Sequence, residues 1–388
     1  MPKAMSDQVV VIVGGSSGIG RTTARMFAER GARVLVTARS ETDLATLVEE
    51  ITAAGGTTSY VVADVADEAA MREVAGTAAE RYGAIDTWVG AAATSVYGRA
   101  WDIPAAEYDT VMRTNWLGQV HGALAALPYL RRSGGTLVCI GSVESVRAVP
   151  LHAPYVSSKM ALRGFCDVLR MDLEAEGAGV AVSLVLPASI DTPFFEHSKS
   201  YAEGAPKPPP PVYAPESVAQ AILRLAEHPQ REVAVGGSAF GFLSGQKLAP
   251  RLTDKLMTAR HSMLRAQQSD APPTGADNMR SPVAGTGSER GGHGGRRSMA
   301  AAVTTARPLV KRAVGLGAAA AGVIASQVAA RAERNRQQRS GQATGTPLVP
   351  PSAPTTAQPG SAPAVVDVTQ LESRTDVSPG ETRGSTAP

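Results

Sequence analysis

Residues 8–20 read QVVVIVGGSSGIG, an apolar and β-branched run that passes directly into a turn rich in glycine. A strand that is apolar on both faces is typical of the interior of a parallel sheet. Glycines at positions 14, 18 and 20 allow a tight turn that brings the backbone close to a pyrophosphate, which the N-terminus of the following helix stabilises. The spacing is not G-x-G-x-x-G, and an ordinary tight turn needs only one or two such glycines. The turn nevertheless predicts a dinucleotide site, because it joins a buried strand to a helix.

Strand-like and helical patterns alternate from this turn to about residue 235. Strands are predicted at 33–37, 57–62, 85–90, 135–141, 180–186 and 232–235, and helices at 41–54, 67–81, 104–131, 154–177 and 215–227. This alternation predicts βαβ units, and therefore an α/β fold in which a single core domain is built on a doubly wound parallel sheet. Ligands of such a sheet bind beyond the carboxyl ends of the strands.

A tyrosine and a lysine stand four residues apart in the helix predicted at 154–177. Tyr155 and Lys159 therefore share one helix face. An ammonium beside a phenol favours the phenolate, so we expect the pKa of Tyr155 to fall from about 10 toward working pH. Such a tyrosine can exchange a proton with an oxygen whose carbon gains or loses hydride. On its own the pair is a weak indication, since this spacing is common on ordinary helices.

Several further segments accompany these two motifs in a characteristic order. Asp64 and Val65 follow the third predicted strand, Asn115 lies in the helix at 104–131, Ser142 precedes Tyr155 by thirteen residues, and Pro187 and Thr192 follow the strand at 180–186. With the glycine-rich turn, this order resembles the short-chain dehydrogenase/reductase family over about residues 7–250. The resemblance implies a Rossmann fold and a reversible carbonyl reduction or alcohol oxidation with a nicotinamide cofactor.

The resemblance also implies a role for each matching residue. Tyr155 is expected to be the general acid/base, Lys159 to lower its pKa and bind the nicotinamide ribose, and Ser142 to hold the substrate oxygen. Asn115 is expected to hold a water through its backbone. Cofactor binding is assigned to Gly14, Ser16, Ser17, Gly18, Ile19, Gly20, Arg39, Asp64, Val65, Tyr155, Lys159, Pro187 and Thr192. Each of these residues also has an ordinary structural role, but their joint occurrence at these intervals favours the catalytic interpretation.

The end of the second predicted strand bears on the choice of cofactor. Sites specific for NAD carry a carboxylate there, which binds the adenosine ribose hydroxyls. This chain instead has Ala38 followed by Arg39, with no acid before Glu41. A guanidinium suits a 2′-phosphate through charge-assisted hydrogen bonds, and family members with arginine here prefer NADP. We therefore predict NADP(H), the alternative being a solvated arginine in a surface loop.

Three departures from the family pattern support a non-catalytic alternative. Val13 stands where most members carry threonine, residues 90–93 read GAAA in place of Asn-Asn-Ala-Gly, and Ala188 replaces a glycine. All three positions shape the cofactor cleft. A dinucleotide-binding scaffold or sensor without activity is therefore the second hypothesis, although an abandoned active site would be expected to lose Tyr155 or Lys159.

The substrate is less well encoded than the cofactor. The predicted pocket loops are 94–99, 143–153 and 189–214, and the last of them contains Phe194, Phe195, Tyr201 and Tyr213. An aromatic loop suits a hydrophobic ketone, aldehyde or alcohol, though these side chains could equally pack the loop against the domain. His121, His152 and His197 lack the spacing of metal ligands, so no metal is expected.

The core domain does not account for all 388 residues. Composition divides the chain into a catalytic domain at 1–250, a helical extension at 251–270, a flexible linker at 271–300, an alanine-rich helix with basic flanks at 301–340, and a disordered tail at 341–388. The segment 301–340 has three interpretations: a helix at an anionic membrane surface, a helix packed on the core or a partner, and a solvated tail.

Charge and cysteine content limit the partners and the compartment. The net charge of +3 and the lack of aromatics in the basic stretch give no case for nucleic acid. Cys139 and Cys166 suggest a reduced thiol pair and, with no apolar leader before the first strand, a cytoplasmic setting with membrane association as an open alternative. The family resemblance implies a homodimer or tetramer.

Overall fold

The computed structural model describes residues 3–239, 250–259, 263–273, 275, 277–283, 285 and 287–297. All of them belong to the first of two compact units, which ends at Arg307. The predicted helix at 301–340, the tail at 341–388 and the membrane-surface interpretation lie outside the described residues. In the part of the chain that is described, no helix has the length and apolar character required to cross a bilayer.

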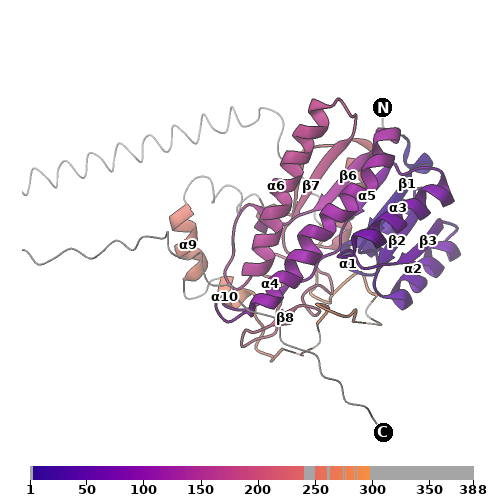
Figure 1. The fold of residues 1–388 in the computed structure, drawn as a ribbon. Coiled ribbons are helices and arrows are strands. Elements are labelled where there is room, and N and C mark those ends of the chain that lie inside the picture. The colour runs from indigo at the N-terminus through magenta and orange to yellow at the C-terminus, as the bar shows by residue number, and fades with distance from the viewer. Residues whose placement is uncertain are drawn as a thin grey trace, which may run out of the picture. The chain divides into compact units, whose positions relative to one another are not determined.

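A parallel sheet forms the centre of the domain (Figure 1). Its described strands are β1 (Val9–Val13), β2 (Arg33–Ala38), β3 (Thr57–Val62), β4 (Thr87–Gly90), β6 (Thr136–Ile140), β7 (Ala181–Pro187) and β9 (Glu232–Val235). They lie in the order β3-β2-β1-β4-β6-β7-β9, and every neighbouring pair is parallel. The direction of winding reverses between β1 and β4, which is where such a sheet binds ligands.

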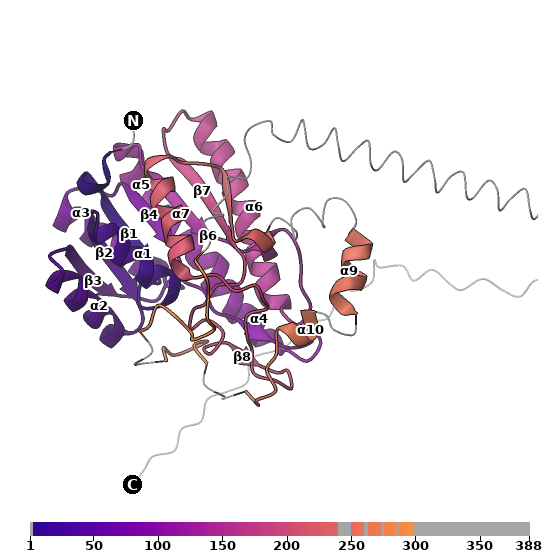
Figure 2. The same ribbon diagram turned by 180° about the vertical axis from the view of Figure 1, so that it is seen from behind.

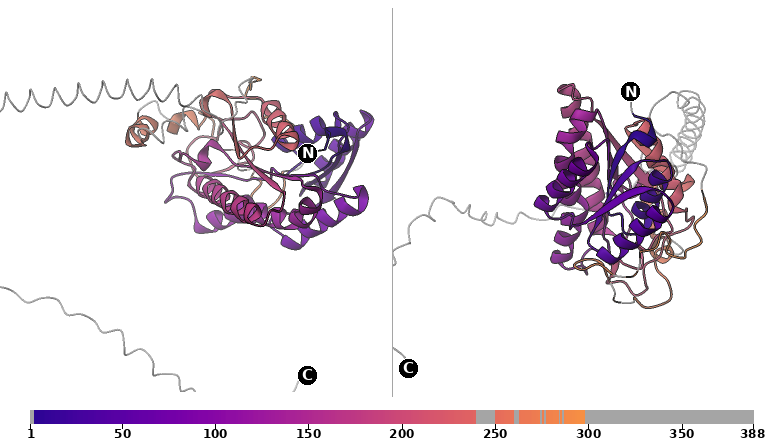
Figure 3. Two further views of the ribbon diagram at one scale, coloured as in Figure 1. Left: turned by 90° about the horizontal axis from the view of Figure 1, so that it is seen from above. Right: turned by 90° about the vertical axis from the view of Figure 1, so that its right-hand side faces the viewer.

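Helices cover both faces of this sheet (Figures 2 and 3). One layer contains α1 (Gly18–Ala28), α2 (Glu41–Ala53) and α7 (Pro215–Glu227), and the other contains α3 (Glu68–Tyr82), α5 (Gly118–Ser133) and α6 (Ala153–Ala175). Strand β1 serves both: Val10 and Ile12 pack in the first layer, while Val11 and Val13 pack in the second. The unbroken apolar run at 9–13 is therefore explained by burial on two faces, and the predicted doubly wound fold is confirmed.

The shorter elements lie mostly around the carboxyl edge of the sheet. They are the 3-10 helices η1 (Met5–Asp7) and η3 (Val143–Ser145), α4 (Ala105–Met112), the π-helical segment η2 (Arg113–Leu117), α9 (Pro250–Thr258), α10 (Met263–Ala266), and strands β5 (Val96–Tyr97) and β8 (Lys199–Ser200), which pair with each other. The single helix predicted at 104–131 is thus divided at Asn115. π-Helical turns of this kind occur often at functional sites.

Candidate active site

The glycine-rich turn leaves a cradle at the N-terminus of α1. Gly14 and Gly18 have φ angles of 84° and 52°, which side chains rarely adopt. A Cβ on Gly20 would lie 2.0 Å from the carbonyl oxygen of Gly14, and one on Gly14 would lie 2.5 Å from the amide nitrogen of Ala92. Backbone amides and a helix N-terminus therefore face a space that only glycines leave open, which fits a pyrophosphate.

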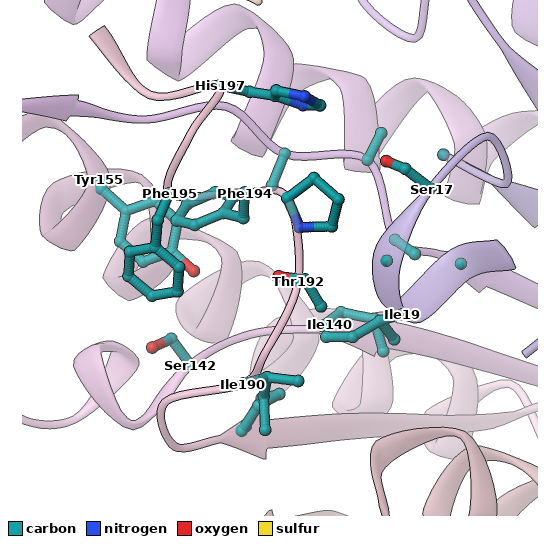
Figure 4. A pocket seen from close by; sticks show the side chains of 18 of the residues that line it. Ser17, Ile19, Ile140, Ser142, Tyr155, Ile190, Thr192, Phe194, Phe195 and His197 are labelled. Atoms are coloured by element: carbon teal, nitrogen blue, oxygen red, sulfur yellow. The ribbon is translucent and has the colours of Figure 1, made fainter. Parts of the chain in front are cut away.

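The residues predicted to transfer protons lie on the opposite side of the same cavity (Figure 4). Tyr155, in the first turn of α6, is nearly buried, and its hydroxyl hydrogen-bonds Ser142 at the end of β6. Lys159 follows one turn later, with Nζ 5.4 Å from the centre of the Tyr155 ring and 2.8 Å from the carbonyl oxygen of Ile140, to which it donates. The helical spacing and the strand end bring the three side chains together, as the sequence predicts.

Electrostatics around Tyr155 differ from the expectation drawn from its lysine neighbour. Burial and the nearby carboxylate of Glu144 raise the pKa of Tyr155 above its ordinary value, while the hydrogen bond with Ser142 lowers it in part. Burial also lowers the pKa of Lys159, to about 8. In this structure the ammonium is directed at the Ile140 carbonyl, so desolvation and Glu144 outweigh its effect on the phenol.

Asn115 is not among the residues that line the cavity, but its side chain connects two segments of the wall. It is fully buried; its Oδ1 accepts from the Thr94 amide at 2.8 Å, and its Nδ2 donates to the Thr94 carbonyl at 2.9 Å and to Ser158 Oγ at 3.1 Å. The side chain thereby ties the loop after β4 to helix α6, which carries Tyr155. Residues 90–93, whose sequence departs from the family pattern, are held at both ends. The bonds of Asn115 fix Thr94 directly after them, and the Ala91 amide donates to the Val13 carbonyl at 2.8 Å.

Arg39 lies at the end of β2 and is about three-quarters buried. Its guanidinium donates to the carbonyl oxygen of Asn278 and lies 3.9 Å from the carboxylate of Asp64. A fixed positive charge is therefore present at the position where the ribose end of a dinucleotide binds in this fold.

The predicted site residues converge with one exception. One cavity of about 260 Å³ is lined by Gly14, Ser16, Ser17, Gly18, Ile19, Gly20, Arg39, Asp64, Val65, Ser142, Tyr155, Lys159, Pro187 and Thr192. Asn115 is the exception, because it supports the wall through Thr94. Tyr97, Glu144 and His152 line the cavity from the predicted pocket loops 94–99 and 143–153, and the lining residues that neither the motifs nor these loops indicated include Met263, Gln267, Asn278, Pro282 and Val283.

The last five of these belong to the C-terminal part of the chain, and residues between 277 and 297 contact the cleft directly. The Gly18 amide donates to the Ser288 carbonyl at 2.9 Å, and the Gly287 amide donates to Asp43 Oδ1 at 3.1 Å. Arg25 pairs with Glu289 at 2.7 Å. Where it is described, the segment expected to be a flexible linker at 271–300 therefore lies against the glycine-rich turn and α1.

Asp191 anchors this segment on the other side of the cleft. Its carboxylate accepts from the backbone amides of Gly291, His293 and Gly295 at 3.1, 2.8 and 2.9 Å. Burial alone would raise the pKa of Asp191, but these amide donors lower it below its ordinary value. A Cβ on Gly291 would lie 2.5 Å from the Thr192 carbonyl oxygen, so the glycines that suggest a linker also permit the close contact.

Comparison with known proteins agrees with this geometry. The model of the short chain dehydrogenase family matches residues 8–202, and the chain belongs to that family. The uncharacterized oxidoreductase YxnA of Bacillus subtilis is 39% identical over 321 residues, which cover 81% of this chain and 90% of YxnA. An alignment that covers 81% of this chain is longer than residues 1–250, so the similarity to YxnA continues into the C-terminal part.

Two solved structures share the fold. An alcohol dehydrogenase of Thermococcus sibiricus, complexed with 5-hydroxy-NADP, is 28% identical, with a TM-score of 0.52 over 58% of this chain and 95% of its own. A short-chain dehydrogenase/reductase of Burkholderia phymatum, in complex with NAD, is 22% identical, with a TM-score of 0.59 over 65% of this chain and 96% of its own. The chain is thus an oxidoreductase of a family whose solved members hold nicotinamide nucleotides of both kinds.

Proposed function

We propose that the chain is an NADP(H)-dependent oxidoreductase that interconverts a carbonyl and an alcohol on a hydrophobic small molecule. The observation that carries the proposal is the shape of one cavity. The glycine cradle and Arg39 lie at one end, and the hydroxyls of Ser142 and Tyr155 lie at the other with Lys159 behind them. This is the arrangement that binding a dinucleotide beside a proton donor requires.

The side chains divide the chemistry among them. When bound, a nicotinamide nucleotide supplies or accepts the hydride. Ser142 donates a hydrogen bond to the substrate oxygen, whose negative charge grows during reduction, and Tyr155 gives that oxygen its proton. Lys159 keeps a positive charge close to the phenolate that remains, at 5.4 Å from the ring centre. Asn115 holds the loop after β4 against α6 and so fixes the position of Tyr155.

The preference for NADP rests on Arg39 and on the state of the nearby acids. Asp43 is buried, and its carboxylate oxygens already accept hydrogen bonds from Ser40 Oγ at 2.7 Å and from the Gly287 amide. Asp64 is half exposed and lies beside the guanidinium. A 2′-phosphate would gain charge-assisted hydrogen bonds from Arg39, as the NADP-type ligand of the Thermococcus sibiricus relative makes reasonable.

Aromatic side chains favour an apolar substrate. Phe194 packs edge-on against Tyr155, with ring centres 5.5 Å apart, and Phe195 packs against Phe194 at the same distance. Tyr155, Phe194 and Phe195 are labelled in Figure 4 among the side chains that line the pocket. A ketone or aldehyde with an aliphatic or aromatic body would bury its apolar surface here while its oxygen reaches Ser142.

The outer face of the second helical layer supports a homodimer or tetramer. Leu124 on α5 and Met160, Val168 and Met171 on α6 are large apolar side chains with 39–58% of their surface exposed. These four exposed apolar side chains lie on two helices of the same layer, and clustered exposed apolar surface marks protein interfaces. A second copy of this chain would cover it with equivalent helices.

A specific contact also supports the second hypothesis, a dinucleotide-binding sensor without turnover. Arg39 and the Gly18 amide are hydrogen-bonded to the carbonyl oxygens of Asn278 and Ser288, and both donors belong to the proposed cofactor site. In a sensor, the nucleotide would displace these contacts and change the position of the C-terminal segment.

Paired titration with NADPH and NADH tests both hypotheses. Trp88 and Trp116 pack in the second core layer, so quenching of their emission reports on the folded domain. Tighter binding of NADPH, followed by reduction of hydrophobic ketones that is lost in Tyr155→Phe, is the expected result. Binding without turnover on any carbonyl would favour the sensor, and equal or tighter binding of NADH would refute the NADP preference.

A further inference from the structure

A buried histidine outside the family motifs lies against Tyr155. His152 immediately precedes α6 and is 2% exposed. Its ring stacks on Tyr155, with centroids 4.4 Å apart and planes 10° apart, and on Tyr97, at 4.2 Å and 21°. Two nearly parallel rings at these distances occupy opposite faces of the imidazole. Tyr155 is therefore the outer member of a three-ring stack that begins on β5.

Hydrogen bonds fix the orientation of the imidazole. Nδ1 lies 2.9 Å from Glu144 Oε2, and Nε2 is hydrogen-bonded to Ser95 Oγ. Because a carboxylate only accepts, Nδ1 carries a proton directed at Glu144. The order serine, histidine and acid is that of an acyl-transfer triad, but Ser95 is buried and is not among the residues that line the cavity. Its hydroxyl therefore holds the imidazole in place.

Glu144 brings negative charge to the same wall of the cavity. It lines the cavity from η3, next to Ser142, and it raises the pKa of both Tyr155 and Tyr97 in addition to the effect of their burial. The titratable groups around Tyr155 are Glu144 from η3, His152 before α6, Tyr97 from β5 and Lys159 from its own helix, and Cys139 and Cys166 face Lys159. Among these, Glu144 is the acid that opposes a phenolate at Tyr155.

We propose that His152 is a positioning residue that fixes the Tyr155 ring and holds Glu144 beside it, and that the Glu144 carboxylate keeps the Tyr155 hydroxyl in the protonated form that carbonyl reduction uses. The inference rests on the proposed function, in which Tyr155 exchanges the proton. In reduction the carbonyl carbon gains a hydride from the reduced nicotinamide nucleotide, the π electrons move to oxygen, and oxygen takes the proton of Tyr155. Solvent then returns a proton to the phenolate. Oxidation needs the phenolate as base, and this is the state that Glu144 disfavours.

The ionisation of Tyr155 can be measured without a substrate. The tyrosinate absorbance of the full-length chain with saturating NADP⁺ is followed against pH, and the same protein carrying Tyr155→Phe is subtracted. Glu144→Gln is expected to move the onset of ionisation down by about one pH unit or more, because a carboxylate that disfavours the phenolate is removed from a poorly solvated site. Glu174→Gln, on the exposed side of α6, is the matched control and should leave the onset unchanged. An unchanged onset in Glu144→Gln overturns the proposal.

A double-mutant cycle tests whether His152 acts through Glu144. His152→Phe keeps an aromatic ring but removes the Nδ1 proton that partly balances the carboxylate, so the onset should move up. The double variant Glu144→Gln with His152→Phe should return to the onset of Glu144→Gln. Equal downward shifts in both single variants would overturn the pairing. NADPH affinity is measured on the same samples, so that the proposed cofactor and the proposed Glu144–His152 pair are tested separately. If the parent chain does not bind NADPH, the proposed cofactor is refuted. The pair is tested by the shifts in the ionisation of Tyr155.

Discussion

The anchoring of the C-terminal segment on Asp191 gives a quantitative prediction. The carboxylate accepts three backbone amides, from Gly291, His293 and Gly295, and lies behind Thr192 at the cavity wall. Asp191→Asn preserves the size of the side chain, removes its charge and turns one acceptor into a donor. We expect the described residues between 287 and 297 to separate from the cleft far more often than in the parent protein.

The size of the effect follows from the three bonds. Oδ1 accepts two of them, so an amide oriented with its oxygen in that position keeps both as neutral hydrogen bonds. Each then loses about 1 kcal/mol, the difference between a charge-assisted and a neutral bond. The third, from Gly295, is replaced by two donors facing each other, at a cost of about 1–2 kcal/mol. The total of about 3–4 kcal/mol corresponds to a roughly hundredfold to thousandfold larger open population.

Amide hydrogen exchange measures this opening residue by residue. Protection at Gly291, His293 and Gly295 should fall by about two to three orders of magnitude in Asp191→Asn, and Gly18, whose amide donates to Ser288, should lose protection with them. Exchange in the central strands should not change. Asp109→Asn is the control, because that acid is exposed and, in the part of the chain that the structure describes, pairs with Arg113 on the helix surface. Parent-like exchange at 291–295 in Asp191→Asn would refute the reasoning.

Three other substitutions test the cofactor cleft and its buried charge. Arg39→Ala should weaken NADPH binding about tenfold to hundredfold and leave NADH binding nearly unchanged in parallel titrations, since only the phosphate loses a charged donor. In Gly20→Ala the Cβ would lie 2.0 Å from the Gly14 carbonyl oxygen, so this variant should not bind the nucleotide and its free energy of unfolding should fall by about 1–3 kcal/mol in chemical denaturation. Gly76 on α3 faces open space, so in the control Gly76→Ala the free energy of unfolding should rise by up to about 1 kcal/mol. Burial lowers the pKa of Lys159 to about 8, so between this pH and the unfolded value of 10.5 the unfolded chain binds more protons than the folded chain. The free energy of unfolding should therefore rise with pH in this window. Denaturation measured against pH should show that Lys159→Met removes this rise.

The fold could be predicted because burial on both faces leaves a clear signal in the sequence. The strands at 57–62 and 232–235 and the helix at 215–227 occur in the structure with the predicted bounds. The division of the helix at 104–131 could not be predicted from periodicity. It depends on Asn115, which reaches the backbone of Thr94 more than twenty residues away in sequence, and a helical pattern contains no information about such a contact.

The site was predictable where chemistry depends on spacing along one element. Tyr155 and Lys159 meet because they are one helical turn apart, and Ser142 joins them from a strand end. The direction of the Tyr155 pKa was not predictable, because it depends on burial and on Glu144, whose position is set by η3 and by its bond with His152. Sequence neighbours give the groups that can interact, but only packing decides which interaction dominates.

The segment between 277 and 297 shows why composition can mislead at a functional cleft. Glycine, serine and arginine are typical of a linker because they bury little apolar surface. Here the contacts come from backbone amides at Gly287, Gly291 and Gly295, and a side-chain pattern cannot show which amides will find an acid. The acids that receive them, Asp43 and Asp191, lie on separate elements of the core on either side of the proposed cofactor site. Since the similarity to YxnA continues beyond residue 250, the same backbone contacts can be sought there as a property shared by both chains rather than a peculiarity of one.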